Sequence, residues 1–190
     1  MIHVRARTYV VDLICHSLCR VYVCMCRSEC LIRVDRVQKV QKGGTMMRYR
    51  SLIIGGNFKG CIGFGVGKAN GPEEATQLAS KNCKRNVIFV EPYQGAGLTS
   101  DLVGKHNSCK VFLRATGVNR PLKGNPLVKE ILSRAGITSC TAKSHGSRNV
   151  YSVVRATFKA LMTHESLEDI SLKRGRRFLN LDRAKRYQIM

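Results

Sequence analysis

Residues 33–85 decide the fold, and they read RVDRVQKVQKGGTMMRYRSLIIGGNFKGCIGFGVGKANGPEEATQLASKNCKR. Paired glycines at 43–44 and 55–56, and another glycine at 60, divide the first part into three segments. Glycines at such intervals mark tight reversals between neighbouring antiparallel strands. The last part begins with Pro-Glu-Glu at 72–74 and ends with basic residues at 81–85, which suits the two ends of a helix dipole. The stretch therefore predicts three antiparallel strands followed by one helix.

The first of these strands is ambiguous. Leu31, Val34, Val37 and Val40 recur at every third residue, which is closer to a helical period than to the alternation of a strand. The β-branched residues and the Gly-Gly pair that follows favour a strand. A strand that contains a β-bulge would reconcile the two signals.

The third strand has a glycine at every second position. Ile62, Phe64 and Val66 fall on one face, which we expect to be core, and glycines 63, 65 and 67 fall on the other. These glycines do not form a nucleotide-binding loop, because neither G-x4-G-K-[ST] nor G-x-G-x-x-G is met. A bare backbone face instead suits an element that packs closely on the strand.

The expected helix has an apolar stripe formed by Ala75, Leu78, Ala79 and Cys83, which we expect to face the sheet. Its basic residues lie on the other side. Three strands with one helix that is basic at its end are also found in the carboxyl-terminal part of a double-stranded-RNA-binding domain, where lysines hold phosphates.

The whole chain is strongly basic. It has 190 residues, with 33 Lys and Arg against 12 Asp and Glu and a formal net charge of +21, while a hydrophobic content of 44% supports a folded core. The segments 31–99 and 100–164 each hold eleven basic residues, against four and two acidic ones. Because the excess lies in the parts that we expect to fold, we predict a polyanion that contacts the protein on several sides.

Residues 1–30 form an extension or transit segment. They hold four Arg against one Asp and one Glu, which is typical of an organellar transit peptide. Asp12, His16 and Arg20 interrupt the apolar stretch, which argues against a membrane span. Five of the nine cysteines lie here, but no C-x2-C pair supports a zinc site. The odd number and uneven spacing favour free thiols in a reducing compartment, and we expect the four later cysteines to be core residues.

A second folded segment, 93–165, follows a double-stranded-RNA-binding-like segment, 31–92, and we expect a linker over 91–107. Here we expect a strand at 110–115, a helix at 127–135 that Gly136 ends, a strand at 137–143 and a helix at 150–164 that Asn149 caps. A basic tail, 166–190, begins with a helix cap at Ser166.

The polar turn expected at 144–149, SHGSRN, brings a hydroxyl, an imidazole and a guanidinium to a helix start, which suits an anion. A catalytic role is not supported. The segment 100–164 contains only Asp101 and Glu130 as carboxylates that could orient His145.

The order of these blocks resembles the family of the small-subunit ribosomal protein called S-five. The resemblance covers residues 31–175 through QKGG, RYRSLIIGG, GCIGFGVGKA, PEEATQLASKNCKRN, KVFLRATG, LSRAGI, AKSHGSRN and VVRATFKAL. It implies an α+β protein. The amino-terminal part would be a three-stranded antiparallel sheet plus helix, similar to a double-stranded-RNA-binding fold, and the carboxyl-terminal part a β-α-β-α domain with a left-handed crossover.

The same resemblance implies a structural role in the small ribosomal subunit, with no enzymatic activity, metal or cofactor. The protein would bind small-subunit ribosomal RNA near the decoding region and the pore where messenger RNA enters, next to proteins S-four and S-eight. There it would support assembly and translational accuracy. The divergent sequence and the arginine-bearing extension suggest an organellar ribosome, in a mitochondrion, with a plastid or a bacterial cytoplasm left open. The alternative is a free double-stranded-RNA-binding regulatory protein.

Carried over by position, the RNA-reaching hairpin of the family corresponds to Gln38, Lys39, Lys42, Gly43, Gly44 and Arg48. The GS-x-N loop corresponds to Gly146, Ser147 and Asn149. The chain departs from the family pattern at Thr45, where an Arg is usual, and in the loop at 117–126. We expect further phosphate contacts from basic side chains elsewhere: Arg50, Lys59, Lys68, Lys81, Lys84, Arg85, Arg148, Arg155, Lys173, Arg174, Arg176 and Arg177.

Overall fold

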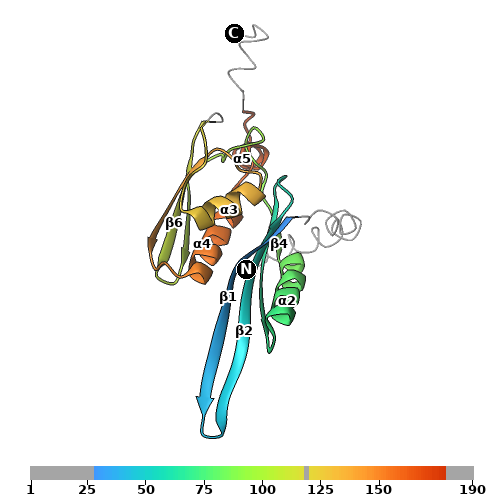
Figure 1. Ribbon diagram of the computed structural model, residues 1–190. Coiled ribbons are helices and arrows are strands. Elements are labelled where there is room, and N and C mark those ends of the chain that lie inside the picture. Colours follow the sequence, from blue (N-terminus) through green and yellow to red (C-terminus); the bar gives the residue numbers. More distant parts are fainter. Residues whose placement is uncertain (1–27, 118–119, 179–190) are drawn as a thin grey trace, which may run out of the picture. The chain divides into compact units, whose positions relative to one another are not determined.

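The computed structural model describes residues 28–117 and 120–178, and these residues form two compact units (Figure 1). Of the described residues, the first unit contains 28–90 and 126–137, and the second contains 91–117, 120–125 and 138–178. Both units combine a sheet with helices, which confirms the predicted α+β class. The predictions made for residues 1–27 lie outside the described residues.

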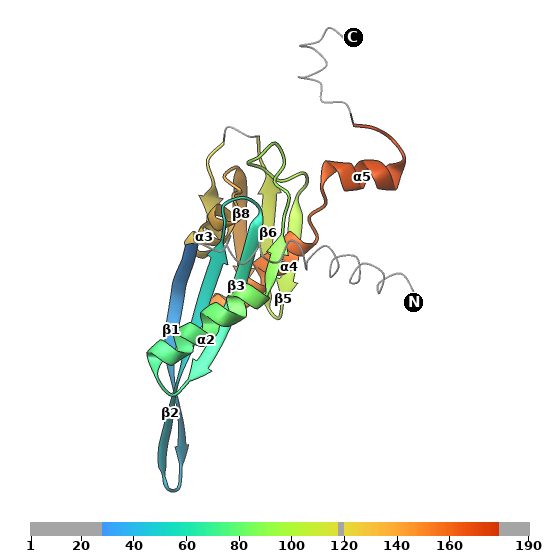
Figure 2. The ribbon, with the colours of Figure 1, turned by 90° about the vertical axis from the view of Figure 1, so that its right-hand side faces the viewer.

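The first unit contains an antiparallel sheet in the order β1-β2-β3-β4. Its elements are β1 (Ser28–Gln41), β2 (Gly44–Gly56), β3 (Cys61–Ala69), α2 (Pro72–Arg85), β4 (Val87–Phe89) and α3 (Pro126–Arg134). The three predicted strands and the helix are present, and the short β4 adds a strand that the sequence did not predict. Figure 2 shows that the hairpin of β1 and β2 extends well past α2.

The bulge that reconciles the two periods of β1 is confirmed. Leu31 pairs with Ile53 and Arg33 pairs with Leu52, so that Ile32 is the extra residue of the strand. Such a residue shifts the faces of the strand by one position. Leu31 and Val34 therefore share a face, since their partners Ile53 and Ser51 are two residues apart. The bulge does not account for the later spacing, because Val37 pairs with Arg48 and lies on the other face.

Helix α2 packs on the glycine face of β3. A Cβ built on Gly65 would lie 2.0 Å from the carbonyl oxygen of Ala79, so that only a bare backbone fits at this position. The close-packed element that the sequence predicted is therefore α2. We expected the opposite face of β3 to be core. Ile62 is fully buried there, but Phe64 and Val66 are only half-buried, so that this face forms only part of the core.

The buried stripe of α2 consists of Ala75, Ala79 and Cys83. Leu78, which the sequence assigned to this stripe, is 42% exposed, so this part of the prediction is wrong. With backbones this close, small residues fill the interface and a leucine at the flank is left at the surface. Ser51 Oγ of β2 donates a hydrogen bond of 2.5 Å to the carbonyl oxygen of Ala75 in the same buried layer.

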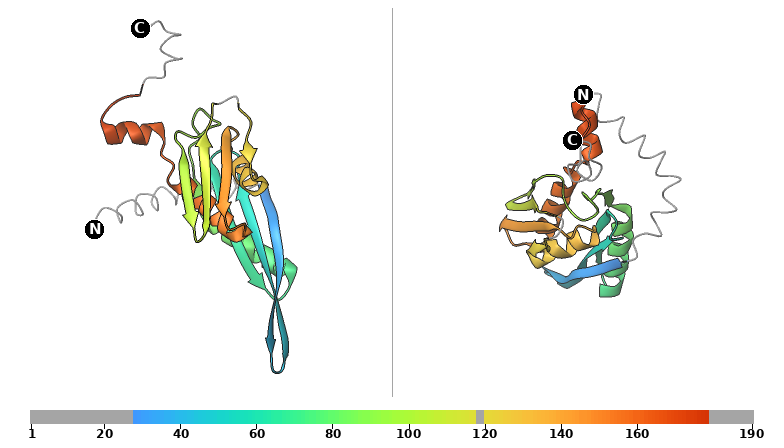
Figure 3. Two further views of the ribbon diagram at one scale, coloured as in Figure 1. Left: turned by 90° about the vertical axis from the view of Figure 1, so that its left-hand side faces the viewer. Right: turned by 90° about the horizontal axis from the view of Figure 1, so that it is seen from above.

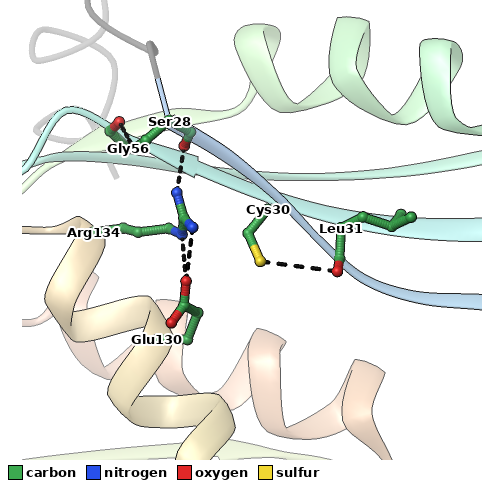
Figure 4. Close-up of polar contacts among 6 residues, drawn as sticks. All are labelled: Ser28, Cys30, Leu31, Gly56, Glu130 and Arg134. Carbon is green, nitrogen blue, oxygen red and sulfur yellow. Dashed lines mark hydrogen bonds and ion pairs between the residues drawn. The ribbon is translucent and has the colours of Figure 1, made fainter.

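Helix α3 is tied to β1 and β2. Its Arg134 donates from Nη1 to the carbonyl oxygen of Ser28 at 2.8 Å and forms an ion pair of 2.7 Å with Glu130, while Ser28 Oγ donates to the carbonyl oxygen of Gly56 at 2.7 Å (Figure 4). The residues of α3 thus pack with the first unit, although we expected them in the segment 93–165. The division into four segments stays a prediction.

The second unit contains a sheet in the order β5-β6-β8-β7, in which only the β7–β8 pair is parallel. Its elements are β5 (Leu102–His106), β6 (Cys109–Ala115), β7 (Lys123–Gly124), β8 (Cys140–Gly146), α4 (Val150–Met162) and α5 (Leu167–Arg174). Figure 3 shows β5, β6 and β8 side by side. The crossover that joins β7 through α3 to β8 is present in the chain order, and its left-handedness stays a prediction.

Two predictions for this unit are wrong, and its two predicted helix caps are confirmed. The expected linker contains β5, and the expected turn at 144–149 begins as the end of β8, so that only 147–149 connect strand and helix. The predicted helix caps are present: Asn149 Oδ1 accepts from the N–H of Tyr151 at 3.2 Å, and Ser166 Oγ accepts from the N–H of Asp169 at 3.1 Å. The four later cysteines (Cys61, Cys83, Cys109 and Cys140) are buried, as expected of core residues.

Candidate nucleic-acid interface

The hairpin of β1 and β2 is the most exposed basic element of the first unit. Lys42 and Gly43 form its two-residue turn, and Gly44 follows with a φ of +132°. A side chain at such a φ is strained, which suits the glycine at this turn. All residues from 36 to 48 are exposed. The predicted residues Gln38, Lys39 and Arg48 therefore lie at the surface.

The strand register sorts the basic residues by face. Residues that are paired across neighbouring strands share a face, and the faces alternate along each strand. Arg50 pairs with Lys68 of β3, and Lys39 pairs with Met46, so that Lys39, Arg48, Arg50 and Lys68 lie on one face of the sheet. Ser51, which bonds to α2, lies on the other face. The structure thus gathers four predicted residues on the side opposite α2, a set that we call the cationic face.

Two further residues of the hairpin lie on the side of α2. Gln38 pairs with Met47, and Arg36 pairs with Tyr49, which places both residues on the face of Ser51. Gln38 was predicted as part of the interface, and the register separates it from Lys39. Arg36 was not predicted. The sequence could have indicated this position, because Arg36 lies three residues before Lys39. In a strand such an odd spacing puts two side chains on opposite faces.

The carboxyl-terminal end of α2 carries a second group of predicted residues. Lys81, Lys84 and Arg85 are all exposed, on the side of the helix away from Cys83. Lys84 forms an ion pair of 3.2 Å with Glu29 at the start of β1. Lys59 lies elsewhere, exposed in the loop between β2 and β3, where its N–H donates to Asn57 Oδ1 at 2.8 Å. Lys59, Lys81 and Arg85 are therefore exposed to an anionic partner, whereas Lys84 already has a carboxylate beside it.

The loop at 146–149 leads into α4 in the second unit. Gly146 has a φ of +83°, and a Cβ there would lie 2.0 Å from the carbonyl oxygen of Ser108, so that this position requires glycine. The N–H of Asn149 donates to Ser147 Oγ at 3.3 Å, and Asn149 in turn caps α4. Arg148 is exposed between them. The loop therefore presents a guanidinium next to a helix amino terminus.

Helix α4 carries two exposed cations one turn apart, the predicted Arg155 and also Lys159. They lie close to His106 of β5. Partial burial lowers the pKa of His106 below its ordinary value, and the positive charges of Lys159 and Arg155 lower it further. Lys159 was missed in the sequence, although its spacing of four residues from Arg155 puts both on one side of a helix.

The predicted tail residues are exposed around the end of α5. Lys173 and Arg174 occupy the last turn of the helix, and Arg176 and Arg177 follow the left-handed Gly175. Lys173 forms an ion pair with Glu165. The predicted site residues thus fall into separate basic groups, and their contacts with RNA stay predictions.

No other kind of site stands out in the part of the chain that the structure describes. Residues 28–117 and 120–178 contain no group of three His, Cys, Asp or Glu side chains that could hold a metal ion. Burial raises the pKa of the Cys140 thiol to about 12, with a smaller contribution from Asp101, so that this thiol stays protonated. In the same residues no helix is long and apolar enough to cross a membrane.

Comparison with known proteins covers both units. The family described as "Ribosomal protein S5, N-terminal domain" matches residues 28–91, and "Ribosomal protein S5, C-terminal domain" matches residues 104–174. The small ribosomal subunit protein uS5 of Brucella ovis is 37% identical over 160 residues, which are 84% of this chain and 86% of the relative. The proteins of the same name from Brucella anthropi and Brucella canis are 36% identical over the same shares.

Proposed function

The chain belongs to the ribosomal protein S5 family, and from this membership we propose that it works as a structural constituent of the small ribosomal subunit. It binds small-subunit ribosomal RNA and is not an enzyme. One observation carries this conclusion: the two domains of the family match the two halves of the chain in order, over residues 28–91 and 104–174.

The hairpin is the part of the molecule that we assign to ribosomal RNA. Its cationic face brings Lys39, Arg48, Arg50 and Lys68 together, with Lys42 at the turn. Lysine and arginine side chains that neutralise phosphates release counterions, which makes binding favourable and dependent on salt. A narrow hairpin that is exposed on both faces can enter a space between RNA helices, where a bulkier element would not fit.

Sedimentation of the tagged full chain tests the ribosomal assignment. We expect it to comigrate with the small subunit at moderate salt, and a light peak free of RNA would instead support the free RNA-binding regulator. We expect Lys42→Glu with Arg48→Glu to weaken incorporation, because two phosphate contacts become repulsions. The control is Lys42→Arg with Arg48→Lys, which keeps both charges. Normal incorporation of the glutamate variant would contradict the hairpin assignment only.

We extend the proposal to the surroundings of the protein in the subunit. By family resemblance, the protein lies near the decoding region and the pore where messenger RNA enters, beside proteins S-four and S-eight, and it influences accuracy. Chemical crosslinking of purified subunits, followed by peptide mass spectrometry, tests the protein neighbours. A stop-codon readthrough reporter in cells that carry the hairpin variant tests accuracy, and unchanged readthrough with normal incorporation would contradict this part.

We place this ribosome in a mitochondrion. The support is the composition of residues 1–30, with four Arg against one Asp and one Glu. The relatives named above are bacterial proteins, so that the bacterial cytoplasm is the main competing location. Fractionation of the source cells with detection of the native chain decides between them. Mass spectrometry of the mature amino terminus from purified ribosomes would also show whether residues 1–30 are removed.

A further inference from the structure

The second sheet has one buried face and one open face. Leu102, Val111 and Leu113 are buried on the side where β5 and β6 contact α4. The register places the intervening residues on the opposite side: Lys105 pairs with Lys110, and Lys110 pairs with His145, so that these three form a row across β5, β6 and β8. All three side chains are exposed. The next row contains Phe112, which pairs with Lys143.

The open face is charged with a single sign. Lys105, Lys110, Arg114 and Lys143 are exposed on it, and the segments of β5, β6 and β8 contain no Asp or Glu at all. Asp101 precedes β5, and its Oδ1 accepts from the N–H of Ala115 at 2.8 Å. Like charges that lie directly opposite each other on neighbouring strands destabilise a sheet. The pairing of Lys105 with Lys110 therefore weakens the isolated protein, and a bound polyanion removes the repulsion.

One end of the open face is hollowed, and its lining has the groups that bind a phosphate. The hollow is lined by Lys105, Asn107, Ser108, Lys110, His145 and Gly146. Two ammonium groups, an amide and a hydroxyl supply donors for the oxygens of a phosphodiester. All of these residues belong to the second unit. His145 and Gly146 lie in the turn for which an anion was predicted, whereas Lys105, Asn107, Ser108 and Lys110 were not assigned to RNA above.

An aromatic pair lies beside this hollow. The rings of Phe112 and His145 have centroids 5.4 Å apart and are almost perpendicular, at 86°. The half-buried Phe112 thus packs edge to face against the exposed imidazole and restricts its orientation. Sheets that bind unpaired nucleotides combine aromatic rings on an open face with cations that hold the backbone. A duplex would leave the ring unused, because its bases are stacked on one another.

We propose that this open face, formed by Lys105, Lys110, Phe112, Lys143 and His145, is a second RNA-binding surface that takes an unpaired segment. In this arrangement a phosphate occupies the hollow and a base stacks on His145. The inference rests on the proposed function, since it specifies where and in which form the ribosomal RNA is bound. It adds a surface that is distinct from the cationic face of the hairpin.

Equilibrium titrations of the full chain test the proposal. The probes are a labelled 12-nucleotide poly(U) strand, a perfectly paired RNA duplex, and heparin as a polyanion without bases. We expect Lys110→Gln to weaken binding of poly(U) and to lower its logarithmic salt slope by about 0.7, the value for one phosphate contact on a single strand. Lys129→Gln removes the same charge from α3 and serves as the matched control, with little change expected.

A second variant separates stacking from charge. We expect His145→Ala to weaken poly(U) binding by about fivefold or more, the lower range for the loss of one stacked base, and to leave heparin binding unchanged. A thermal melt guards against misfolding. Lys110→Gln should keep or raise the melting temperature, since it relieves the repulsion with Lys105. If Lys110 had only a structural role, this variant would lower both the melting temperature and RNA binding.

The outcomes distinguish the two proposals. If both variants bind poly(U) as the wild type does, while the hairpin variant Lys42→Glu with Arg48→Glu loses RNA, the open face is not an RNA surface and the proposed function stands. If Lys110→Gln binds naked RNA normally but is not incorporated into small subunits, the face contacts a protein and the inference is overturned. If the wild-type chain binds none of the RNA probes, the proposed function itself fails.

Discussion

The two halves of β2 show how one strand serves two purposes. Residues 44–48 are all exposed and include Arg48, whereas residues 51–56 are all buried. Next to the buried half, the glycines of β3 let α2 approach the backbone, whereas in the exposed half the side chains reach outward. The comparison teaches that close packing at the buried end holds the hairpin in place. The exposed end contributes little apolar burial, and it carries cations that repel one another.

The largest expected effect is at Gly65 of β3, which pairs with Ile53 in the buried half of β2. A Cβ there would lie 2.0 Å from the carbonyl oxygen of Ala79 and 2.4 Å from the nitrogen of Cys83, so that Gly65→Ala forces backbone against backbone. We expect the free energy of unfolding to fall by about 3 kcal/mol or more, at the upper end of the range for overpacking. Denaturation with urea measures this change.

Gly43→Ala is the matched control at the exposed end. A Cβ on Gly43 would meet no heavy atom within 4 Å, and its φ is not in the left-handed region. We expect this variant to change stability by less than about 0.5 kcal/mol, as for surface substitutions in general. Equal losses in the two variants would contradict the contrast between the two halves of the sheet.

The second expected effect compares the two faces of the hairpin. Arg48 lies on the cationic face and Arg36 lies on the side of α2, and both side chains are exposed. We expect Arg48→Gln to weaken binding of small-subunit ribosomal RNA by about tenfold and to lower the logarithmic salt slope by about 0.9, as for the loss of one phosphate contact. Filter binding at several salt concentrations measures both values.

Arg36→Gln removes the same charge one strand position closer to the buried half, because Arg36 pairs with Tyr49, and should have the smaller effect. If the two variants weaken RNA binding equally, RNA encloses the hairpin on both sides and the cationic face has no special role. If only Arg36→Gln weakens binding, the assignment of faces is reversed.

Local signals predicted much of this fold because each acts over a few residues. The glycine pairs gave the strand boundaries, Asn149 and Ser166 gave two helix caps, and the three-residue spacing from Leu31 to Val34 gave a bulge. In each case the structural cause lies within one turn of the chain.

The failures have long-range causes. The strand β5 was missed because Gly104 interrupts its short apolar pattern, and that glycine is needed where a Cβ would lie 2.0 Å from the carbonyl oxygen of Ala156. Leu78 was misplaced because the spacing of α2 to the sheet depends on the glycines of β3. The open face of the second sheet was invisible for the same reason, because its rows arise from pairing between β5, β6 and β8.

A third effect tests a polar contact within the buried half of β2. Ser51 is fully buried, and its Oγ donates to the carbonyl oxygen of Ala75 at 2.5 Å. We expect Ser51→Ala to lower the free energy of unfolding by about 1 kcal/mol, the typical net value of one hydrogen bond. Urea denaturation measures it, with the exposed Ser100→Ala as the control. An unchanged free energy of unfolding in Ser51→Ala would mean that α2 moves slightly and packs against the alanine, which offsets the lost hydrogen bond.

The smallest effect is beside the buried half of β2, where Glu29 at the start of β1 lies opposite Gly55 and forms an ion pair of 3.2 Å with Lys84. Both side chains are partly exposed, at 29% and 49%, so that water and salt screen the pair. We expect Glu29→Gln to change the free energy of unfolding by less than about 0.5 kcal/mol, and by less at high salt, as for most surface ion pairs.

Because the substitution leaves Lys84 without this carboxylate, RNA affinity at low salt should rise slightly if Lys84 faces the RNA. A fall in RNA affinity with unchanged stability would indicate that Glu29 positions Lys84 for its phosphate. The salt slopes of the wild type and of Glu29→Gln would show whether Glu29 competes with the phosphate for Lys84 or positions Lys84 for it.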